Sequence, residues 1–187
     1  MILKHKEVYI SVDVETAGPK PSQYSLLSIG ACLVSDPAQG FYVELQPVTD
    51  AVRLESLKVS GLDMDALRSR GLPPAEAMRC FAEWVEAITP AQGQPVFVAL
   101  NAPFDWMFAA DYFHRFLGHN PFGHKALDMK AFFMGMHSIH WNETGFEDIT
   151  RHYQVEFSLP HHALQDARAQ AELFRRMLKE QEERKKT

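Results

Sequence analysis

The chain of 187 residues is 46% hydrophobic and 23% charged, as in an ordinary globular protein with one domain over residues 1–187. Its formal net charge of −5 argues against a protein that coats long nucleic acid through a basic face. Because no apolar run approaches the ~20 residues that cross a bilayer, and the first residues do not follow the order of a secretion signal, we expect a cytoplasmic protein with no membrane partner.

Three strands are predicted first, joined as a meander by short loops. Residues 8–15 are a β-branched and aromatic run that breaks at a segment with two prolines. Residues 26–34 predict a second strand, and residues 41–45 predict a third after a turn at 36–40.

Helical spacing dominates the rest of the chain. Short helices are expected at 51–59 and 63–70, and a clearer one begins at Pro73-Pro74. After an apolar strand at 95–100, four more helices are expected, at about 103–117, 128–136, 143–153 and 162–184, with a charged tail over about 180–187. Strands first and helices around them predict an α+β or α/β domain of three layers with a mixed sheet.

Asp13 and Glu15 lie at the end of the first predicted strand. Side chains two residues apart on a strand project from the same face. Two carboxylates this close repel each other unless a divalent cation lies between them, and oxygen ligands of this kind suit Mg²⁺ or Mn²⁺. The alternative is a pair of solvated acids at a strand end.

A second polar group follows the strand at 95–100. Asn101 is placed to cap the next helix, and Pro103 lies in its first turn. Asp105 then lies near the positive end of the helix dipole, beyond the strand ends where ligands gather in α/β sheets. An ordinary helix start is the alternative interpretation.

The third group surrounds the start of the last helix. His162 and Asp166 are four apart and would share a helix face. His161 can cooperate with Asp166 only if it lies in the entry loop, which Pro160 favours. Spacing alone therefore leaves both histidines open, with a slight preference for His162.

Together the three groups supply four carboxylates and a base that titrates near neutral pH, each at the start or end of a regular element. Carboxylates that hold two divalent cations about 3.5–4 Å apart are the equipment for phosphodiester hydrolysis. A histidine can take the proton of the attacking water. The set predicts a metal-dependent phosphodiesterase.

At these residues the sequence resembles the DnaQ-like 3′→5′ exonuclease superfamily in its histidine-containing DEDD form, and is similar to ribonuclease T and its relatives. Three motifs match in the family's order over essentially the whole chain: Asp13-Val14-Glu15-Thr16, Asn101-x-x-Phe104-Asp105 and His161-x-x-x-x-Asp166. The resemblance implies a ribonuclease H-like three-layer fold with a central mixed five-stranded sheet flanked by helices.

The resemblance also implies roles for single residues. Two Mg²⁺ ions, or Mn²⁺ in their place, would be held by four carboxylates: Asp13, Glu15, Asp105 and Asp166. His161, rather than His162, would be the general base. Three residues would contact the terminal nucleotide: Thr16, Ala17 and Asn101. The partner would be the 3′ end of single-stranded DNA or RNA, and the product a nucleoside 5′-monophosphate.

Other functions are compatible with the same motifs. One is the proofreading (epsilon) subunit of DNA polymerase III, although the segment that docks such a subunit on its polymerase has no counterpart before Thr187. Another is a non-catalytic domain that binds nucleic acid, against which the intact set of acids and base argues. A homodimer is possible, as in some relatives, but no self-complementary patch is legible in the sequence.

Three further signals are interpreted conservatively. Asp128 could support the metal ligands or cap a helix, and the cap is the favoured interpretation. His137 and His140 are three apart, but no third metal ligand is identifiable beside them, so solvated or core histidines are the favoured interpretation. Cys32 and Cys80 lack C-x-x-C spacing, which argues against a structural zinc or redox motif.

Overall fold

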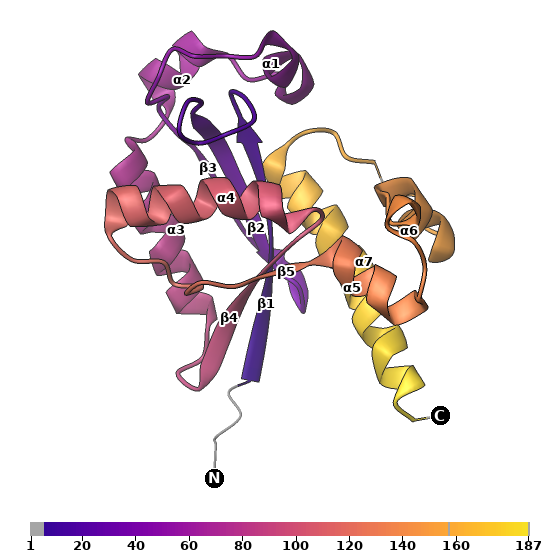
Figure 1. Cartoon of the computed structure of the whole chain (residues 1–187). Coiled ribbons are helices and arrows are strands. Elements are labelled where there is room, and N and C mark those ends of the chain that lie inside the picture. The colour runs from indigo at the N-terminus through magenta and orange to yellow at the C-terminus, as the bar shows by residue number, and fades with distance from the viewer. Residues whose placement is uncertain (1–5, 157, 187) are drawn as a thin grey trace.

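The computed structural model describes residues 6–156 and 158–186, which contain a five-stranded sheet in the order β3-β2-β1-β4-β5 (Figure 1). The strands are β1 (Lys6–Thr16), β2 (Leu26–Leu33), β3 (Asp36–Glu44), β4 (Gly93–Ala99) and β5 (Ala126–Asp128). β2 pairs antiparallel with β1 and β3, whereas β4 runs parallel to β1 and β5. This mixed sheet of five strands confirms the predicted fold class.

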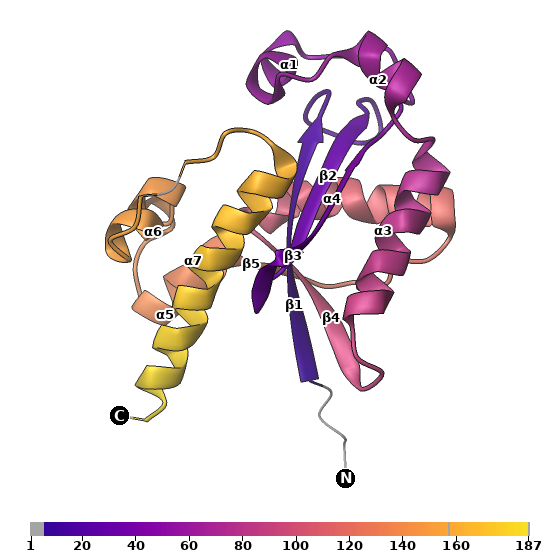
Figure 2. The same ribbon diagram turned by 180° about the vertical axis from the view of Figure 1, so that it is seen from behind.

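Helices cover both faces of the sheet. They are α1 (Leu54–Ser60), α2 (Met64–Arg70), α3 (Pro74–Ile88), α4 (Ala102–Tyr112), α5 (Met129–His137), α6 (Phe146–His152) and α7 (Ala163–Arg184). Figures 1 and 2 show α3 and α4 on one side of the sheet, α5 and α7 on the other, and α1 and α2 beyond the strand ends. None of the helices in the described part of the chain is long and apolar enough to cross a bilayer.

Side chains of the central strand β1 point alternately to the two helical layers on either side of the sheet. Its residues Ile10, Val12 and Val14 belong to the apolar cluster under α3 and α4. The residues between them face the other way, and there Gln170 of α7 reaches Asp13. A strand that is apolar on one face therefore presents its acids to α7.

Three predicted elements differ from the structure. Residues 36–40 belong to β3 rather than to a turn, because Leu33 pairs with Asp36 while Cys32 pairs with Gly40, and the residues between form a bulge. The short strand β5 was not predicted, because three residues are too few to show an alternating hydrophobic pattern. The helix expected at 103–117 is α-helical only to Tyr112, after which a π-helical turn spans Phe113–Leu117.

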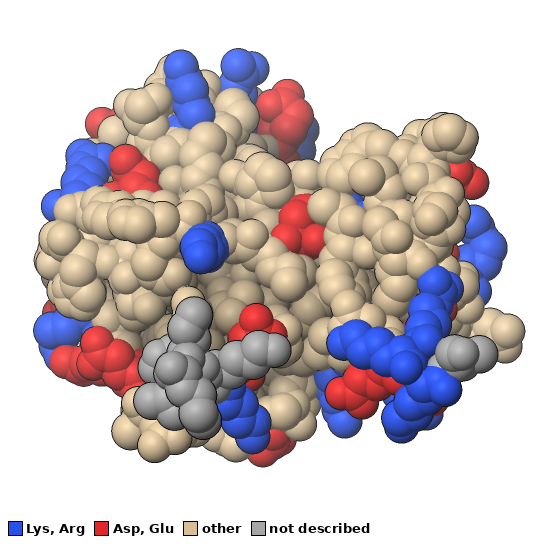
Figure 3. Space-filling view, turned by 60° about the horizontal axis from the view of Figure 1, so that its bottom comes forward, with Lys and Arg blue, Asp and Glu red and all other residues tan. Residues whose placement is uncertain are grey.

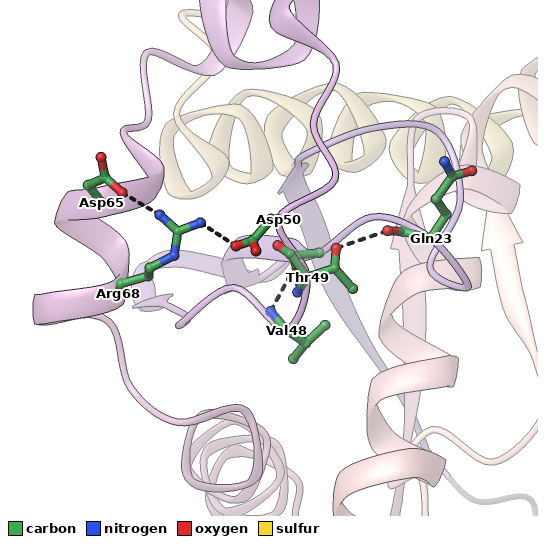
Figure 4. Close-up of polar contacts among 7 residues, drawn as sticks. Gln23, Val48, Thr49, Asp50, Asp65 and Arg68 are labelled. Atoms are coloured by element: carbon green, nitrogen blue, oxygen red, sulfur yellow. Dashed lines mark hydrogen bonds and ion pairs between the residues drawn. The ribbon is translucent and has the colours of Figure 1, made fainter.

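The segment that carries α1 and α2 is tied to the loop after β1. Arg68 of α2 contacts both Asp65 and Asp50, the latter at 2.6 Å (Figure 4). Next to this pair, the hydroxyl of Thr49 donates to the carbonyl oxygen of Gln23 at 2.9 Å. These exposed contacts add little stability, and a small apolar cluster beneath them completes the attachment: Ala17, Tyr24, Leu27 and Leu67.

Candidate active site

The first motif lies in the part of β1 that extends beyond its pairing with β4. The pairing of β1 with β4 stops at Ser11 and Val98, whereas β1 continues to Thr16. Asp13 and Glu15 are therefore placed beyond the carboxyl end of β4. In sheets with parallel strands this edge is where ligands bind.

Asp105 reaches the same place from the start of α4. Because β4 has ended, the N–H of Val14 has no strand partner on this side, and it donates to Oδ1 of Asp105 at 3.1 Å. The Asp105 side chain is almost completely buried, in the first turn of the helix. The backbone of the first motif thus fixes the carboxylate of the second.

The prediction that the Asn101 side chain caps α4 is wrong, because another residue caps this helix. Asn101 occupies the N-cap position with a φ of 64°, and its side chain makes no capping hydrogen bond. The N–H of Ala102 instead donates to Asp128 at 2.6 Å, while the other oxygen of Asp128 accepts from Ala131 at 2.7 Å. The predicted capping role of Asp128 is confirmed, and this one carboxylate organises the starts of both α4 and α5.

The third motif lies at the start of α7. Asp166 lies in the first turn of the helix, and His161 precedes the helix in the left-handed region, at a φ of 56°. One ligand atom each of Glu15, His161 and Asp166 lie within 4.8 Å of one another. The ring of His162 instead stacks on Tyr42, with centroids 4.6 Å apart. The structure therefore groups His161 with the acids, because the left-handed backbone turns it back toward them.

Gly30 allows α7 to approach the sheet closely enough for this grouping. Gly30 pairs with Asp13 across β1 and β2. A Cβ at Gly30 would lie 2.0 Å from the carbonyl carbon of Ala163 and 2.1 Å from the nitrogen of Leu164. Only a glycine leaves room for the first turn of α7 at this point.

Gln170 is a site residue that sequence reasoning missed. Its side chain is buried, with its amide nitrogen donating to Oδ1 of Asp13 at 2.7 Å. Its amide oxygen accepts from the N–H of Leu100 at 2.9 Å. The only available signal was its position one turn after Asp166 on the same face of the helix. Gln170 thus joins α7, β1 and the end of β4 at the acids.

The four carboxylates lack a lysine or arginine partner among the described residues. Among the ion pairs of the described residues, none includes Asp13, Glu15, Asp105 or Asp166. Burial and the charges of the other three acids raise the pKa of Asp13 well above its usual range, while Gln170 partly offsets the shift. Burial followed by neighbouring carboxylates raises the pKa of Glu15 to about 8. Burial likewise raises the pKa of Asp105 to about 8, although the Val14 N–H opposes it.

This charge imbalance fits a site for divalent cations. Oδ1 of Asp166 is buried and has no hydrogen-bond partner among residues 6–156 and 158–186. Buried oxygens of this kind are rarely left unsatisfied in proteins. Oxygen ligands in such numbers suit Mg²⁺ or Mn²⁺, whose charge would offset the repulsion.

A cavity of about 300 Å³ opens beside Glu15 and is lined by Val14, Glu15, Thr16, Glu55, Ser56, Val59 and Phe104. Its size lies at the lower end of the range of small-ligand pockets, ~300–1,000 Å³. Thr16, for which a nucleotide contact is predicted, is one of the lining residues. Ala17 is fully buried in the apolar cluster beneath α1 and α2 and does not line it, so the position of its side chain does not support the predicted substrate contact. Asn101 is exposed at the start of α4.

Comparison with known proteins agrees with this geometry. The RNase T family, described as an exonuclease, matches residues 10–174. The chain is 43% identical over 180 residues to the 3′-5′ DNA exonuclease Cap18 of Escherichia coli, with 96% of each chain covered.

Solved structures share the fold at low identity. The nuclease domain of 3′hExo, a DEDDh family member bound to rAMP, matches with a TM-score of 0.75 at 11% identity, covering 93% of this chain and 92% of that one. E. coli exonuclease I in complex with a dT13 oligonucleotide matches with a TM-score of 0.70 at 15% identity, covering 92% of this chain but 41% of that one. The predicted resemblance is thereby confirmed, and the chain belongs to the RNase T family of 3′→5′ exonucleases.

Proposed function

We propose that this protein is a magnesium-dependent exonuclease that removes nucleoside 5′-monophosphates one at a time from the 3′ end of single-stranded DNA, in the cytoplasm, and that residues 1–187 act as one domain. The observation that supports the proposal is the convergence of β1, α4 and α7: Glu15, His161 and Asp166 lie close together, and Asp13 interacts electrostatically with the other three acids. DNA is the proposed substrate because the relative that is 43% identical is a DNA exonuclease.

The residues that would hold the cations are Asp13, Glu15, Asp105 and Asp166. When bound, two Mg²⁺ ions, or Mn²⁺ in their place, supply positive charge that offsets the acids and the phosphate and that acidifies the attacking water. Gln170 and the N–H of Val14 keep Asp13 and Asp105 in fixed positions for this.

His161 performs the proton transfer in this proposal. Its ring is exposed to solvent beside Glu15 and Asp166, so a water between the ring and the phosphate can hydrogen-bond to it. An imidazole titrates near neutral pH and accepts the proton as the water attacks. The terminal nucleotide is proposed to lie in the cavity beside Thr16, where Phe104 offers an aromatic wall for a base.

The test uses a single-stranded DNA oligonucleotide labelled at its 3′ end, and an RNA of the same sequence. Magnesium should restore release of labelled mononucleotides after EDTA treatment. Asp13→Asn and His161→Ala should lower kcat by at least about 100-fold, the lower end of what general base catalysis contributes. His162→Ala is the matched control and should retain most of the activity, since its ring stacks on Tyr42.

Three results would contradict parts of the proposal. Activity in His161→Ala equal to that of the intact protein would remove the general base. Release of long fragments would show cleavage within the strand rather than at its end. Equal rates on RNA and DNA would contradict the assignment of DNA as the substrate.

A further inference from the structure

A second group of possible metal ligands lies outside the candidate active site, where α5, α6 and α7 meet. His137 ends α5, His152 ends α6, and Glu180 projects from the later turns of α7. One ligand atom of each residue lies within 4.8 Å of the other two. The sequence offers no third metal ligand beside His137 and His140, whereas the folded chain brings His152 and Glu180 to His137.

The distances in this group match those of a zinc site. Oε2 of Glu180 lies 3.4 Å from Nε2 of His137 and 3.6 Å from Nε2 of His152. In a tetrahedral site with bonds of about 2.0–2.1 Å, neighbouring ligand atoms are about 3.3 Å apart. The two glutamate–histidine distances are therefore close to those of such a site, and all three ligand atoms lie within 4.8 Å of one another.

The surroundings hold the three side chains in place. Tyr153 donates to Oε2 of Glu180 at 2.8 Å, and Arg184 donates to the other oxygen at 2.7 Å. The ring of Phe133 lies against both imidazoles, with centroids 4.4 Å from His137 and 5.3 Å from His152. In proteins, metal ligands are oriented by neighbouring residues that contact them in this way.

One nitrogen at this place is unsatisfied. The side chain of His137 is 10% exposed, and its Nε2 is buried without a hydrogen-bond partner in the described residues. The alternative to a metal site is a pair of ion pairs between the histidines and Glu180. Both nitrogen–oxygen distances, however, are longer than those of ordinary hydrogen bonds. A bound cation would give this nitrogen a partner.

The group is also open to an ion from outside. A cavity of about 320 Å³ borders both histidines and is lined by Phe133, His137, Ile139, Glu143, Asp148, Arg151 and His152. Basic side chains gather around the C-terminal end of α7, with acidic ones among them (Figure 3). Two of the basic residues there are paired, Arg184 with Glu180 and Lys179 with Glu183.

We propose that His137, His152 and Glu180 bind one Zn²⁺ ion, with a water at the fourth position facing this cavity. Zinc sites of two histidines and one glutamate with an open fourth position are chemically well suited to this ion. The ion would join the ends of α5 and α6 to α7 and so stabilise the layer that carries Asp166.

Arg184 provides an internal competitor for the ion. Its Nη2 lies 3.0 Å from Nδ1 of His137, and because a guanidinium only donates, this contact puts the imidazole proton on Nε2. Zinc needs that nitrogen unprotonated, so binding must move the proton to Nδ1 and break this one contact. Arg184 keeps its hydrogen bond from Nε to Oε1 of Glu180, at 3.0 Å.

The test measures metal binding in the full chain after removal of metals by a chelator. All proteins carry Asp13→Asn and Asp166→Asn, so that the active-site acids do not contribute a second binding site. Zn²⁺ is titrated by calorimetry, and Co²⁺ is titrated by its visible absorption, which is intense only in a tetrahedral site. His137→Ala and His152→Asn are compared with His140→Ala as the matched control.

One equivalent of Zn²⁺ is expected in the background protein and in His140→Ala, with a rise in melting temperature. His137→Ala and His152→Asn should weaken binding by more than about 100-fold. That is the upper limit for substitutions of residues that contact the ligands but not the metal. Arg184→Gln should tighten it. Equal affinity in His152→Asn, whose exposed ring leaves the fold intact, or absence of tetrahedral Co²⁺ absorption in the background protein would overturn the proposal.

Discussion

Replacing Gly30 by alanine brings a new Cβ into the backbone of α7. The Cβ would lie 2.0 Å from the carbonyl carbon of Ala163, whereas ordinary contact begins at 3.4 Å. Neither strand β2 nor the helix backbone can bend away locally, so the first turn of α7 must retreat by about 1.4 Å. His161 and Asp166 flank the contact and move with it. Because a misplacement of about 1 Å can cost ~100-fold in rate, kcat should fall by about that factor.

The assay is release of mononucleotides from 3′-labelled DNA, with thermal unfolding measured in parallel. Overpacking should also destabilise the fold by about 1–3 kcal/mol. Gly135→Ala is the matched control, since a Cβ there meets nothing within 4 Å and alanine favours the helix by up to ~1 kcal/mol. Full activity together with an unchanged melting temperature in Gly30→Ala would refute the reasoning.

Three further predictions concern the surroundings of the acids. Gln170→Leu removes the hydrogen bond to Asp13 and should raise the Mg²⁺ concentration for half-maximal activity about tenfold; an unchanged Mg²⁺ titration would count against this role. Because the folded-state pKa values of Glu15 and Asp105 are raised to about 8, the metal-free fold holds protons that the unfolded chain releases near pH ~4. Its stability should therefore fall between about pH 5 and 8, as melts in EDTA would show, and excess Mg²⁺ should flatten the trend. Asp128→Ala leaves two helix starts without an acceptor and should cost at least about 1–2 kcal/mol in urea unfolding, whereas a loss near zero would contradict this capping role.

The sequence predicts the elements whose side chains repeat regularly. The β-branched run of β1 and the apolar face of α3 were recognisable because they are long enough to show a period. β5 has three residues and is defined by pairing with β4, which no local pattern reveals. The bulge in β3 likewise depends on register with β2.

The candidate site was predictable in composition but not in detail. The acids could be found because carboxylates at the ends of apolar elements are costly without a partner. The choice of His161 over His162 depends on a left-handed backbone at a non-glycine residue, which spacing does not indicate. Gln170 could be suspected only from its place one turn after Asp166, since its contact with Asp13 forms only when α7 packs on β1. The cap of α4 comes from a residue 26 positions away, so the local choice of Asn101 was wrong.

The division of the site among β1, α4 and α7 has a consequence for biosynthesis. The ribosome completes β1 and α4 well before α7 emerges, so a nascent chain carries two of the three motifs without the last carboxylate or the histidine. Only docking of α7 over Gly30 unites them. Under the proposed function, a chain whose α7 has not docked therefore lacks Asp166 and His161 at the site and should not hydrolyse nucleic acid.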